Sequence, residues 1–413
     1  MNKTTSIPAR PAGKDSPWPL IRLGDVTRTS SGGTPSRSVV AYYQGNICWA
    51  KIEDLTRSGM WLQHTEERIT EAAVEGTNAK VFPARTVFIA MYGSIGATSI
   101  TAVPMSCNQA ILGCECNPDL YPEFLYYWVC LNRDALLRRG RGGTQANLNA
   151  KIVNDLRIPY PLLSEQKRIA DVLQKQMAAV DKARTATQAR LAAVKALPAA
   201  FLRQVFPQPG QPLPDGWRWV RLGDFADTTS GTTPSRSNPE YYGGNIPWVK
   251  TGELRDECID QAEEHVTRLA LEECSLSLLP PDTLLIAMYG QGQTRGRTGL
   301  LRIYATTNQA CFAVLPNETE FSPSYLQAWF RLNYQRIRTE TESRGGNQPN
   351  LNGQILQNMM VPLPPLAEQG RIAGLLHEQM ATVDKARAAA EEELNTINAL
   401  PAALLRRAFN GEI

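Results

Sequence analysis

Histidine, paired cysteines and long apolar runs are scarce or missing in this sequence. Its 413 residues include three histidines, and none of the eight cysteines forms a Cys-x-x-Cys pair. These counts argue against a structural zinc site. No apolar run approaches the roughly 20 residues of a membrane-spanning helix, and residues 1–16 lack the apolar stretch of a secretory signal. We therefore expect reduced thiols, a cytoplasmic location and a flexible tail over residues 1–16.

The sequence also lacks a strong charge of either sign. Lys and Arg total 43 against 40 for Asp and Glu, which gives a formal net charge of +3. A balance this mild says little about partners. Any surface for nucleic acid must therefore be a local patch.

An internal repeat of about 200 residues organises the chain. Ser31-Gly-Gly-Thr-Pro-Ser-Arg-Ser38 returns as Ser230-Gly-Thr-Thr-Pro-Ser-Arg-Ser237, and Ile89-Ala-Met-Tyr-Gly93 returns as Ile286-Ala-Met-Tyr-Gly290. Arg141-Gly-Gly-Thr-Gln-Ala-Asn-Leu-Asn149 returns as Arg344-Gly-Gly-Asn-Gln-Pro-Asn-Leu-Asn352. One structural unit is therefore used twice, with small insertions in its loops.

Each copy divides into two parts of different composition. Short β-rich runs between Gly, Pro, Ser and Asn turns predict α/β or α+β globules over residues 17–161 and 217–364. Ala, Leu, Glu, Gln, Lys and Arg then dominate, which predicts long helices over residues 162–206 and 365–413. A proline-rich linker, residues 207–216, leads into the second globule. The predicted class is α+β, with two similar globules separated by a pair of long antiparallel coiled-coil helices.

Apolar residues recur every seven positions in both helical segments, as a coiled-coil seam requires. The alternative is an amphipathic helix packed on its own globule. Pro198 and Pro401 predict a kink or a restart in each helix. A helix of some forty residues would be about 60 Å long. The predicted seam residues are Leu173, Val180, Val194, Phe201, Leu376, Val383, Ile397 and Leu404.

The repeat provides a control on catalytic motifs, because a site used by both halves should appear twice. No Gly-x-Gly-x-x-Gly segment follows a predicted strand, and no phosphate-binding loop of the Gly-Lys-Ser/Thr type occurs. The histidines do not align between copies, since His265 falls opposite Arg68. We therefore expect no catalytic residues, and no metal or cofactor bound by this chain.

Polar side chains gather instead around Gly-rich loops and in the repeated Ser-Gly-x-Thr-Pro-Ser-Arg-Ser segment. Guanidinium groups there can pair with phosphates or guanine edges, and amides with adenine. Segments that differ between the copies are the candidate base readers, whereas shared cations suit a phosphate clamp. The alternative is that these loops only cap helices. The candidate contacts are Arg37, Lys51, Tyr92, Ser94, Arg138, Arg139, Arg141, Gln145 and Asn147 in the first copy, and Arg236, Lys250, Tyr289, Gln291, Arg295, Arg297, Arg344, Gln348 and Asn350 in the second.

The closing motif of each globule carries a family resemblance. Pro362-Leu-Pro-Pro-Leu-Ala-Glu-Gln-Gly-Arg-Ile-Ala373 has its first copy at Pro159-Tyr-Pro-Leu-Leu-Ser-Glu-Gln-Lys-Arg-Ile-Ala170. With Gly-x-Thr-Pro-Ser, Asn-Ile-x-Trp and Tyr-Gly in each globule, the chain resembles the specificity subunit of type I restriction–modification systems. The likeness covers nearly the whole chain.

The resemblance implies two target-recognition domains, each reading one half of a bipartite, asymmetric site in double-stranded DNA. It also implies that the helices set the spacing and dock two modification subunits, which carry S-adenosylmethionine. Restriction subunits would add ATP- and Mg-dependent translocation and cleavage. Two other hypotheses are a single-chain DNA methyltransferase with duplicated domains and a purely structural coiled-coil spacer.

Overall fold

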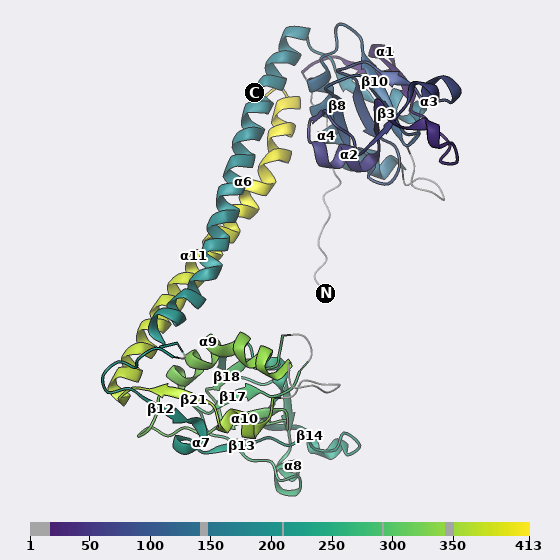
Figure 1. The fold of residues 1–413 in the computed structure, drawn as a ribbon. Helices are drawn as coiled ribbons and strands as arrows, with labels where there is room; N and C mark the ends of the chain where they lie inside the picture. The colour runs from purple at the N-terminus through teal and green to yellow at the C-terminus, as the bar shows by residue number, and fades with distance from the viewer. Residues whose placement is uncertain (1–16, 141–147, 209, 291–292, 343–350) are drawn as a thin grey trace. The chain divides into compact units, whose positions relative to one another are not determined.

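The computed structural model divides into two compact units. They comprise Met1–Gln188 with Glu392–Ile413, and Ala189–Glu391. We call them the first and the second unit (Figure 1). The predicted tail, residues 1–16, lies outside the described residues. The structure describes residues 17–140, 148–208, 210–290, 293–342 and 351–413.

The first unit is built on a five-stranded sheet of order β2-β10-β7-β8-β4. A four-stranded sheet, β5-β3-β9-β6, and a two-stranded sheet, β1-β11, accompany it. In chain order the elements are β1 (Leu20–Arg22), α1 (Leu23–Val26), β2 (Thr27–Ser31), η1 (Val40–Tyr42), β3 (Tyr43–Ala50), α2 (Ile52–Ser58), β4 (Trp61–Leu62), β5 (Glu67–Ile69), α3 (Glu71–Gly76), β6 (Val81–Phe82), β7 (Val87–Ala90), β8 (Thr98–Thr101), β9 (Met105–Cys107), β10 (Ile111–Cys116), α4 (Pro122–Gly140), α5 (Ala150–Asn154) and β11 (Arg157–Pro159).

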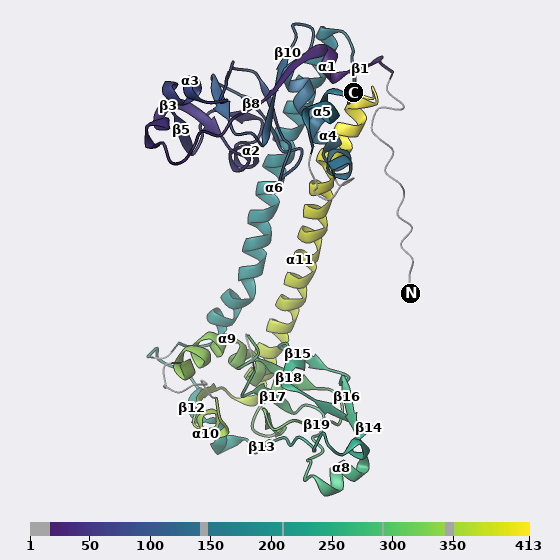
Figure 2. The same cartoon turned by 90° about the vertical axis from the view of Figure 1, so that its right-hand side faces the viewer.

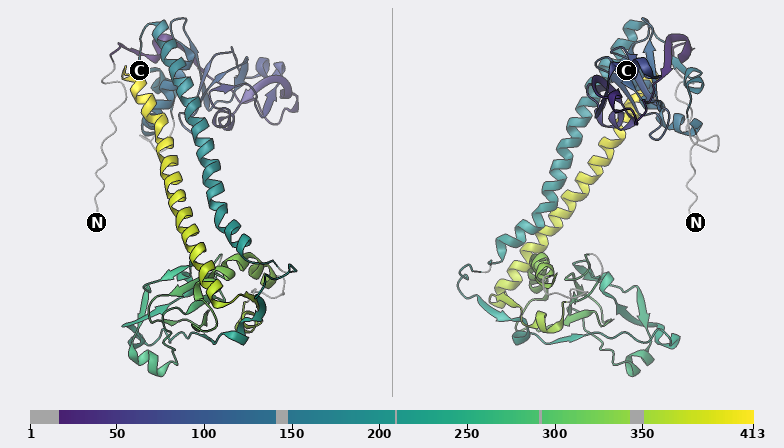
Figure 3. Two further views of the ribbon diagram at one scale, coloured as in Figure 1. Left: turned by 90° about the vertical axis from the view of Figure 1, so that its left-hand side faces the viewer. Right: turned by 45° about the vertical axis from the view of Figure 1, so that its right-hand side comes forward.

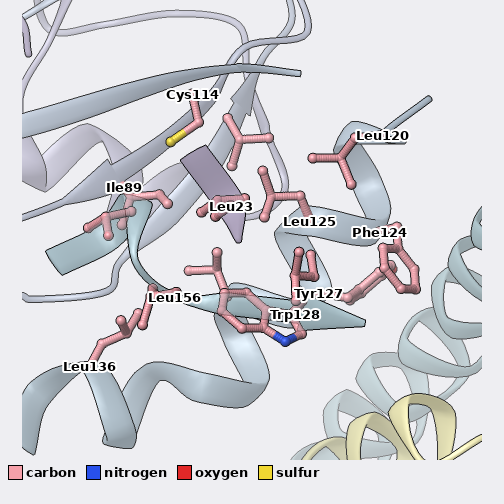
Figure 4. Packing of buried hydrophobic residues seen from close by; sticks show 14 of the residues in the cluster. Leu23, Ile89, Cys114, Leu120, Phe124, Leu125, Tyr127, Trp128, Leu136 and Leu156 are labelled. Carbon is pink, nitrogen blue, oxygen red and sulfur yellow. The ribbon is translucent and has the colours of Figure 1, made fainter. Parts of the chain in front are cut away.

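The core of the first unit lies between the five-stranded sheet and helix α4. Every residue of β7 is buried, as expected for an apolar central strand covered on both faces. Ile89 from this strand belongs to the same buried cluster as Phe124 and Trp128 of α4 (Figure 4). Phe409, near the C-terminus, joins the same core with its ring centroid 4.9 Å from that of Phe124, and the end of helix α11 (Leu366–Phe409) lies next to α4 (Figure 2).

The second unit repeats this arrangement. Its five-stranded sheet has the order β13-β20-β17-β18-β15, beside sheets β16-β14-β19 and β12-β21. Its elements are β12 (Arg218–Arg221), α7 (Leu222–Phe225), β13 (Thr228–Ser230), η2 (Pro239–Tyr241), β14 (Tyr242–Val249), η3 (Thr251–Glu253), β15 (Glu257–Ile259), β16 (Glu264–Val266), α8 (Arg268–Glu273), β17 (Leu284–Ala287), β18 (Thr298–Leu301), β19 (Thr306–Thr307), β20 (Cys311–Val314), α9 (Pro323–Glu342), α10 (Gly353–Gln357) and β21 (Met360–Leu363).

The two long helices begin at the duplicated Glu-Gln motif, and the buried glutamine explains why it recurs. Helix α6 (Leu163–Val205) contains Gln166, which is fully buried. Its Nε2 donates to the carbonyls of Asp119 and Pro161 at 2.9 and 3.0 Å, and its Oε1 accepts from Tyr121 N at 2.8 Å. Gln369 makes the matching bonds at the start of α11. Each glutamine thus joins its long helix to the globule before it.

Part of α6 lies beside part of α11 within each unit (Figure 3). In the first unit, Arg184 Nε donates to Asn398 Oδ1 at 3.0 Å and Thr187 Oγ1 donates to Glu393 Oε1 at 3.1 Å. Because rising residue numbers in α6 meet falling numbers in α11, the two helices are antiparallel. This pairing confirms the predicted helical pair. The alternative, in which each helix packs only on its own globule, is wrong.

The predicted seam is correct at five of its eight positions and shifts by one residue after the prolines. Leu173, Val180, Leu376, Val383 and Ile397 are buried. Phe201 and Leu404 are only partly buried, whereas their neighbours Leu202 and Leu405 are 5% and 7% exposed. Val194 is also partly buried.

The buried position moves by one residue after the prolines because Leu202 packs into the core of the second unit and Leu405 into the core of the first. Both helices continue through their proline, so the predicted restart at Pro198 and Pro401 does not occur, and the alternative of a kink stays a prediction. None of the described helices combines the length and apolar character needed to cross a membrane.

Candidate nucleic-acid interface

Two of the predicted cations in the first unit meet at one carboxylate. Arg37 precedes η1, Lys51 immediately precedes α2, and Glu67 opens β5. Arg37 Nη1 lies 2.6 Å from Glu67 Oε2, and Lys51 Nζ lies 2.7 Å from Glu67 Oε1. We call Arg37, Lys51 and Glu67 the first basic cluster.

Two aromatic side chains support the Arg37 guanidinium. Its Cζ lies 4.5 Å from the centre of the Tyr43 ring and 5.6 Å from that of Trp49. The Trp49 side chain is buried and donates from Nε1 to Gly33 O at 3.0 Å, and Tyr43 Oη donates to Pro35 O at 2.6 Å. The aromatic pair therefore packs the Gly-x-Thr-Pro-Ser segment and stabilises the arginine by cation–π contact.

The second unit repeats the cluster almost atom for atom. Arg236 Nη2 and Lys250 Nζ lie 2.8 and 2.7 Å from the two carboxylate oxygens of Glu264. The Arg236 Cζ lies 4.3 Å from the centre of the Tyr242 ring and 5.3 Å from that of Trp248. We call Arg236, Lys250 and Glu264 the second basic cluster.

The carboxylate at the centre of each cluster is held in its charged form. Hydrogen bonds from Arg37 and Lys51 lower the pKa of Glu67 from 4.5 to about 2. The pKa of Glu264 is lowered in the same direction, chiefly by Lys250 and also by Arg236. The three named side chains of each cluster sum to one net positive charge, and in the second unit Lys250 Nζ also lies 3.6 Å from Glu263 Oε2. The guanidinium side chains are 60% and 57% exposed, so a phosphate could reach them only in competition with the glutamate.

A second group of predicted contacts in the first unit lies where the loop after β7 meets the end of α4. Tyr92 is 37% exposed and Ser94 is half-buried. Arg138 and Arg139 are exposed in the last turn of α4, and neither forms an ion pair with a described side chain. Leu148 N donates to Met91 O at 3.0 Å. Leu148 thus lies beside Tyr92, and Arg133 and Leu136 of α4 lie next to Gly96 of the same loop.

The corresponding residues of the second unit are more tightly held. Tyr289 is 39% exposed, like Tyr92. Arg297 pairs with Asp256 at 2.5 Å. Arg295 is only 6% exposed, so its predicted base contact would require the loop to move. Seven further predicted contacts lie outside the described residues, namely Arg141, Gln145, Asn147, Gln291, Arg344, Gln348 and Asn350.

The acidic members of these sites are not among the contacts predicted from the sequence. Glu66-Glu67 returns as Glu263-Glu264, so alignment of the two copies could have found the central carboxylates. Asp256 and Tyr334, which contact Arg297, have no counterpart of the same type in the first copy. Only the tertiary structure brings them to the arginine.

Comparison with known proteins gives the class of this duplicated fold. The family described as "Type I restriction modification DNA specificity domain" matches residues 15–191 and 214–396. The type I restriction enzyme EcoBI specificity subunit of Escherichia coli is 23% identical over 96% of this chain and 80% of the relative. The MjaIX specificity subunit of Methanocaldococcus jannaschii is 23% identical over 69% of each chain.

Solved structures share the fold over nearly the whole chain. One, from work on the assembly and conformational transition of the type I R-M system, has a TM-score of 0.72 and 22% identity, covering 96% of this chain and 98% of the other. The crystal structure of the HsdS subunit from Thermoanaerobacter tengcongensis has a TM-score of 0.66 and 21% identity, covering 96% and 97%. Both likenesses extend over the two globules and the helices.

The fold is thus that of a duplicated recognition protein. The chain belongs to the type I restriction–modification DNA specificity family and carries two copies of its domain. This membership confirms the predicted DNA specificity subunit with two recognition domains, and the expectation of a recognition role in place of a catalytic one.

Proposed function

We propose that each unit reads one half of a bipartite, asymmetric sequence in double-stranded DNA, within a type I restriction–modification complex. The paired helices set the distance between the half-sites and dock two modification subunits. Restriction subunits join the same complex. S-adenosylmethionine, ATP and Mg are bound by these partner subunits, and the complex works in the cytoplasm.

One observation carries the proposal: the two units have equivalent strand pairs, but the loops that follow these strands differ. Strands β7 and β17 pair with β10 and β20 in the same register, Ala90 with Ile111 and Ala287 with Cys311. The loop that follows each of them differs in length and charge. It reads Gly93-Ser-Ile-Gly-Ala97 in the first unit and Gly290-Gln-Gly-Gln-Thr-Arg-Gly-Arg297 in the second. Two domains that share a strand framework and differ in these loops suit an asymmetric target. We call the loops the reading loops of the two units.

The shared cations suit the sequence-independent part of binding. Arg37 and Arg236 are exposed and occupy equivalent positions above equivalent aromatic pairs. Contacts to phosphate fix position along a duplex and carry no sequence information, so they can be common to both domains. Arg138 and Arg139 add two exposed positive charges in the last turn of α4, the helix whose Arg133 and Leu136 lie next to Gly96 of the first unit's loop.

The length and continuity of the helices support the spacing role. Helices α6 and α11 have 43 and 44 residues without interruption. At about 1.5 Å per residue, each is longer than one turn of DNA, roughly 34–36 Å.

A domain exchange tests the proposal. Residues 18–160 are replaced by the corresponding domain of another family member, and each chain is purified together with its modification subunits. Bound sequences are then selected from a duplex library with a randomised region and read by sequencing. We expect the exchange to change one half of the preferred sequence and to leave the other half and the spacer unchanged. A change in both halves, or no preferred sequence for the original chain, would contradict the proposal.

A further inference from the structure

The reading loop of the second unit closes as a turn between strands β17 and β18. Ala287 N donates to Arg297 O at 2.9 Å, and Gly296 N donates to Ala287 O at 2.8 Å. Gly296 has a φ of +85°, a conformation that favours glycine. We call residues 293–297 the second reading loop.

Helix α9 holds the backbone of this loop through two side chains. Tyr334 Oη donates to Gln293 O at 2.5 Å. Arg338 Nη1 donates to Arg295 O at 3.2 Å, and Arg295 Nη2 donates back to Arg338 O at 3.5 Å. The helix thus binds carbonyl groups at two points of the loop.

The Tyr334 ring also joins the two arginines on either side of the contact. The Arg297 and Arg338 Cζ atoms lie 4.7 and 5.4 Å from the ring centre. Arg297 is tied in turn to Asp256, whose Oδ1 accepts from Thr298 N and Oγ1 at 2.9 Å each. The loop is therefore fixed both to α9 and to the strand that follows it.

The first unit has an apolar contact at the equivalent place. Its loop is three residues shorter and carries Ile95, which is 2% exposed, where the second has Arg295. A Cβ on Gly96 would lie 3.1 Å from Arg133 Cγ and 3.4 Å from Leu136 Cδ1. Helix α4 thus packs against its loop through Arg133 and Leu136, and among the residues that the structure describes the polar clamp is seen in the second domain alone.

We propose that Tyr334 and Arg338 are positioning residues that determine the sequence selectivity of the second domain by holding the second reading loop. The inference rests on the proposed function. A loop held before binding loses less conformational freedom when it meets DNA, and selectivity depends on groups placed to within a fraction of an ångström. The buried Arg295 acts in this arrangement through its carbonyl and its bond to the helix.

The test uses the full chain, purified with its modification subunits, and the randomised duplex library. Tyr334→Phe removes the hydroxyl donor and keeps the ring between the arginines. Arg338→Met removes the donors and keeps the apolar stem, and Arg338→Lys restores one donor. Gln335→Ala is the matched control, because Gln335 is exposed on the same helix. The domain exchange shows which half of the preferred sequence the second domain reads.

We expect Tyr334→Phe and Arg338→Met to reduce base preference in that half by about three- to tenfold, the range of a typical net hydrogen-bond contribution. The other half and the melting temperature should stay unchanged, and Arg338→Lys should recover part of the preference. Equal loss in both halves, or a lower melting temperature with unchanged preference, would show a structural role and overturn the inference. Unchanged preference in every variant would also overturn it and leave the proposed function standing. A wild-type complex without any preferred sequence would overturn both.

Discussion

Replacing Glu67 by glutamine should lower stability and raise affinity for DNA at the same time. Glu67 is the carboxylate shared by Arg37 and Lys51, at 2.6 and 2.7 Å. The amide keeps the size of the side chain and removes its charge. The first basic cluster then changes from one net positive charge to two.

The loss of stability can be bounded from the pKa of the carboxylate. A pKa of about 2 in the folded chain, against 4.5 for the ordinary group, corresponds to a ceiling of about 3 kcal/mol. The Glu67 side chain is 25% exposed and that of Arg37 is 60% exposed, so solvent screens the pair. We therefore expect a loss of about 1–2 kcal/mol.

The gain in affinity follows from the freed cations. Each additional phosphate contact makes the slope of log K against log salt steeper by about 0.9. We expect Glu67→Gln to bind any duplex about three- to tenfold more tightly at low salt, with a steeper salt dependence and unchanged sequence preference.

The pH dependence has a definite sign. Because the pKa of Glu67 is lowered in the folded chain, the ionised carboxylate stabilises the fold fully above pH 4.5. This contribution to the free energy of unfolding is lost as the pH falls toward about 2. The difference in stability between wild type and Glu67→Gln should therefore shrink across this window.

Chemical denaturation at several pH values and fluorescence titration with a duplex of unrelated sequence measure the two effects. Glu264→Gln should act in the same direction but less strongly, because Lys250 keeps its pair with Glu263 at 3.6 Å. Glu75→Gln, which changes an exposed glutamate, should have little effect. Unchanged affinity and salt slope in Glu67→Gln would refute the idea that the glutamate competes with phosphate.

Three further substitutions test the core and the surface. Gln166→Leu should cost about 2–4 kcal/mol in chemical denaturation, because it leaves two carbonyls and an amide without their buried partner. Phe409→Ala should cost about 3–5 kcal/mol, since the ring is 1% exposed in the core of the first unit. Arg139→Ala should weaken binding to all duplexes alike and reduce the salt slope by about 1, as measured by titration over a range of salt concentrations.

Each of these has a matched control on the same chain. Gln174→Leu changes an exposed glutamine of α6, and Phe201→Ala a partly buried ring, so both should cost less than their counterparts. Arg371→Ala removes an exposed arginine already paired with Glu368. Equal stability losses in Gln166→Leu and Gln174→Leu would refute the role of the buried glutamine. If Arg371→Ala weakened DNA binding as much as Arg139→Ala, the predicted phosphate contact of Arg139 would be refuted.

Much of the architecture could be predicted from the order of residues because it depends on local, repeated patterns. The duplication is visible as matched segments, and the long helices follow from composition and seven-residue spacing, which act through neighbouring turns. Leu173 and Val383 lie on the buried face as that spacing predicts. The start of each long helix at Leu163 and Leu366 also agrees with the composition change.

The chemistry of the candidate interface was decided by contacts between distant segments. Arg37 and Lys51 read as free cations in the sequence, but β3 pairs with β5 and brings Glu67 to both of them. Arg295 looks available in a glycine-rich loop and is buried against a helix some forty residues further along the chain. Charge and exposure depend on which groups the fold places within a few ångströms, and no local pattern contains that information.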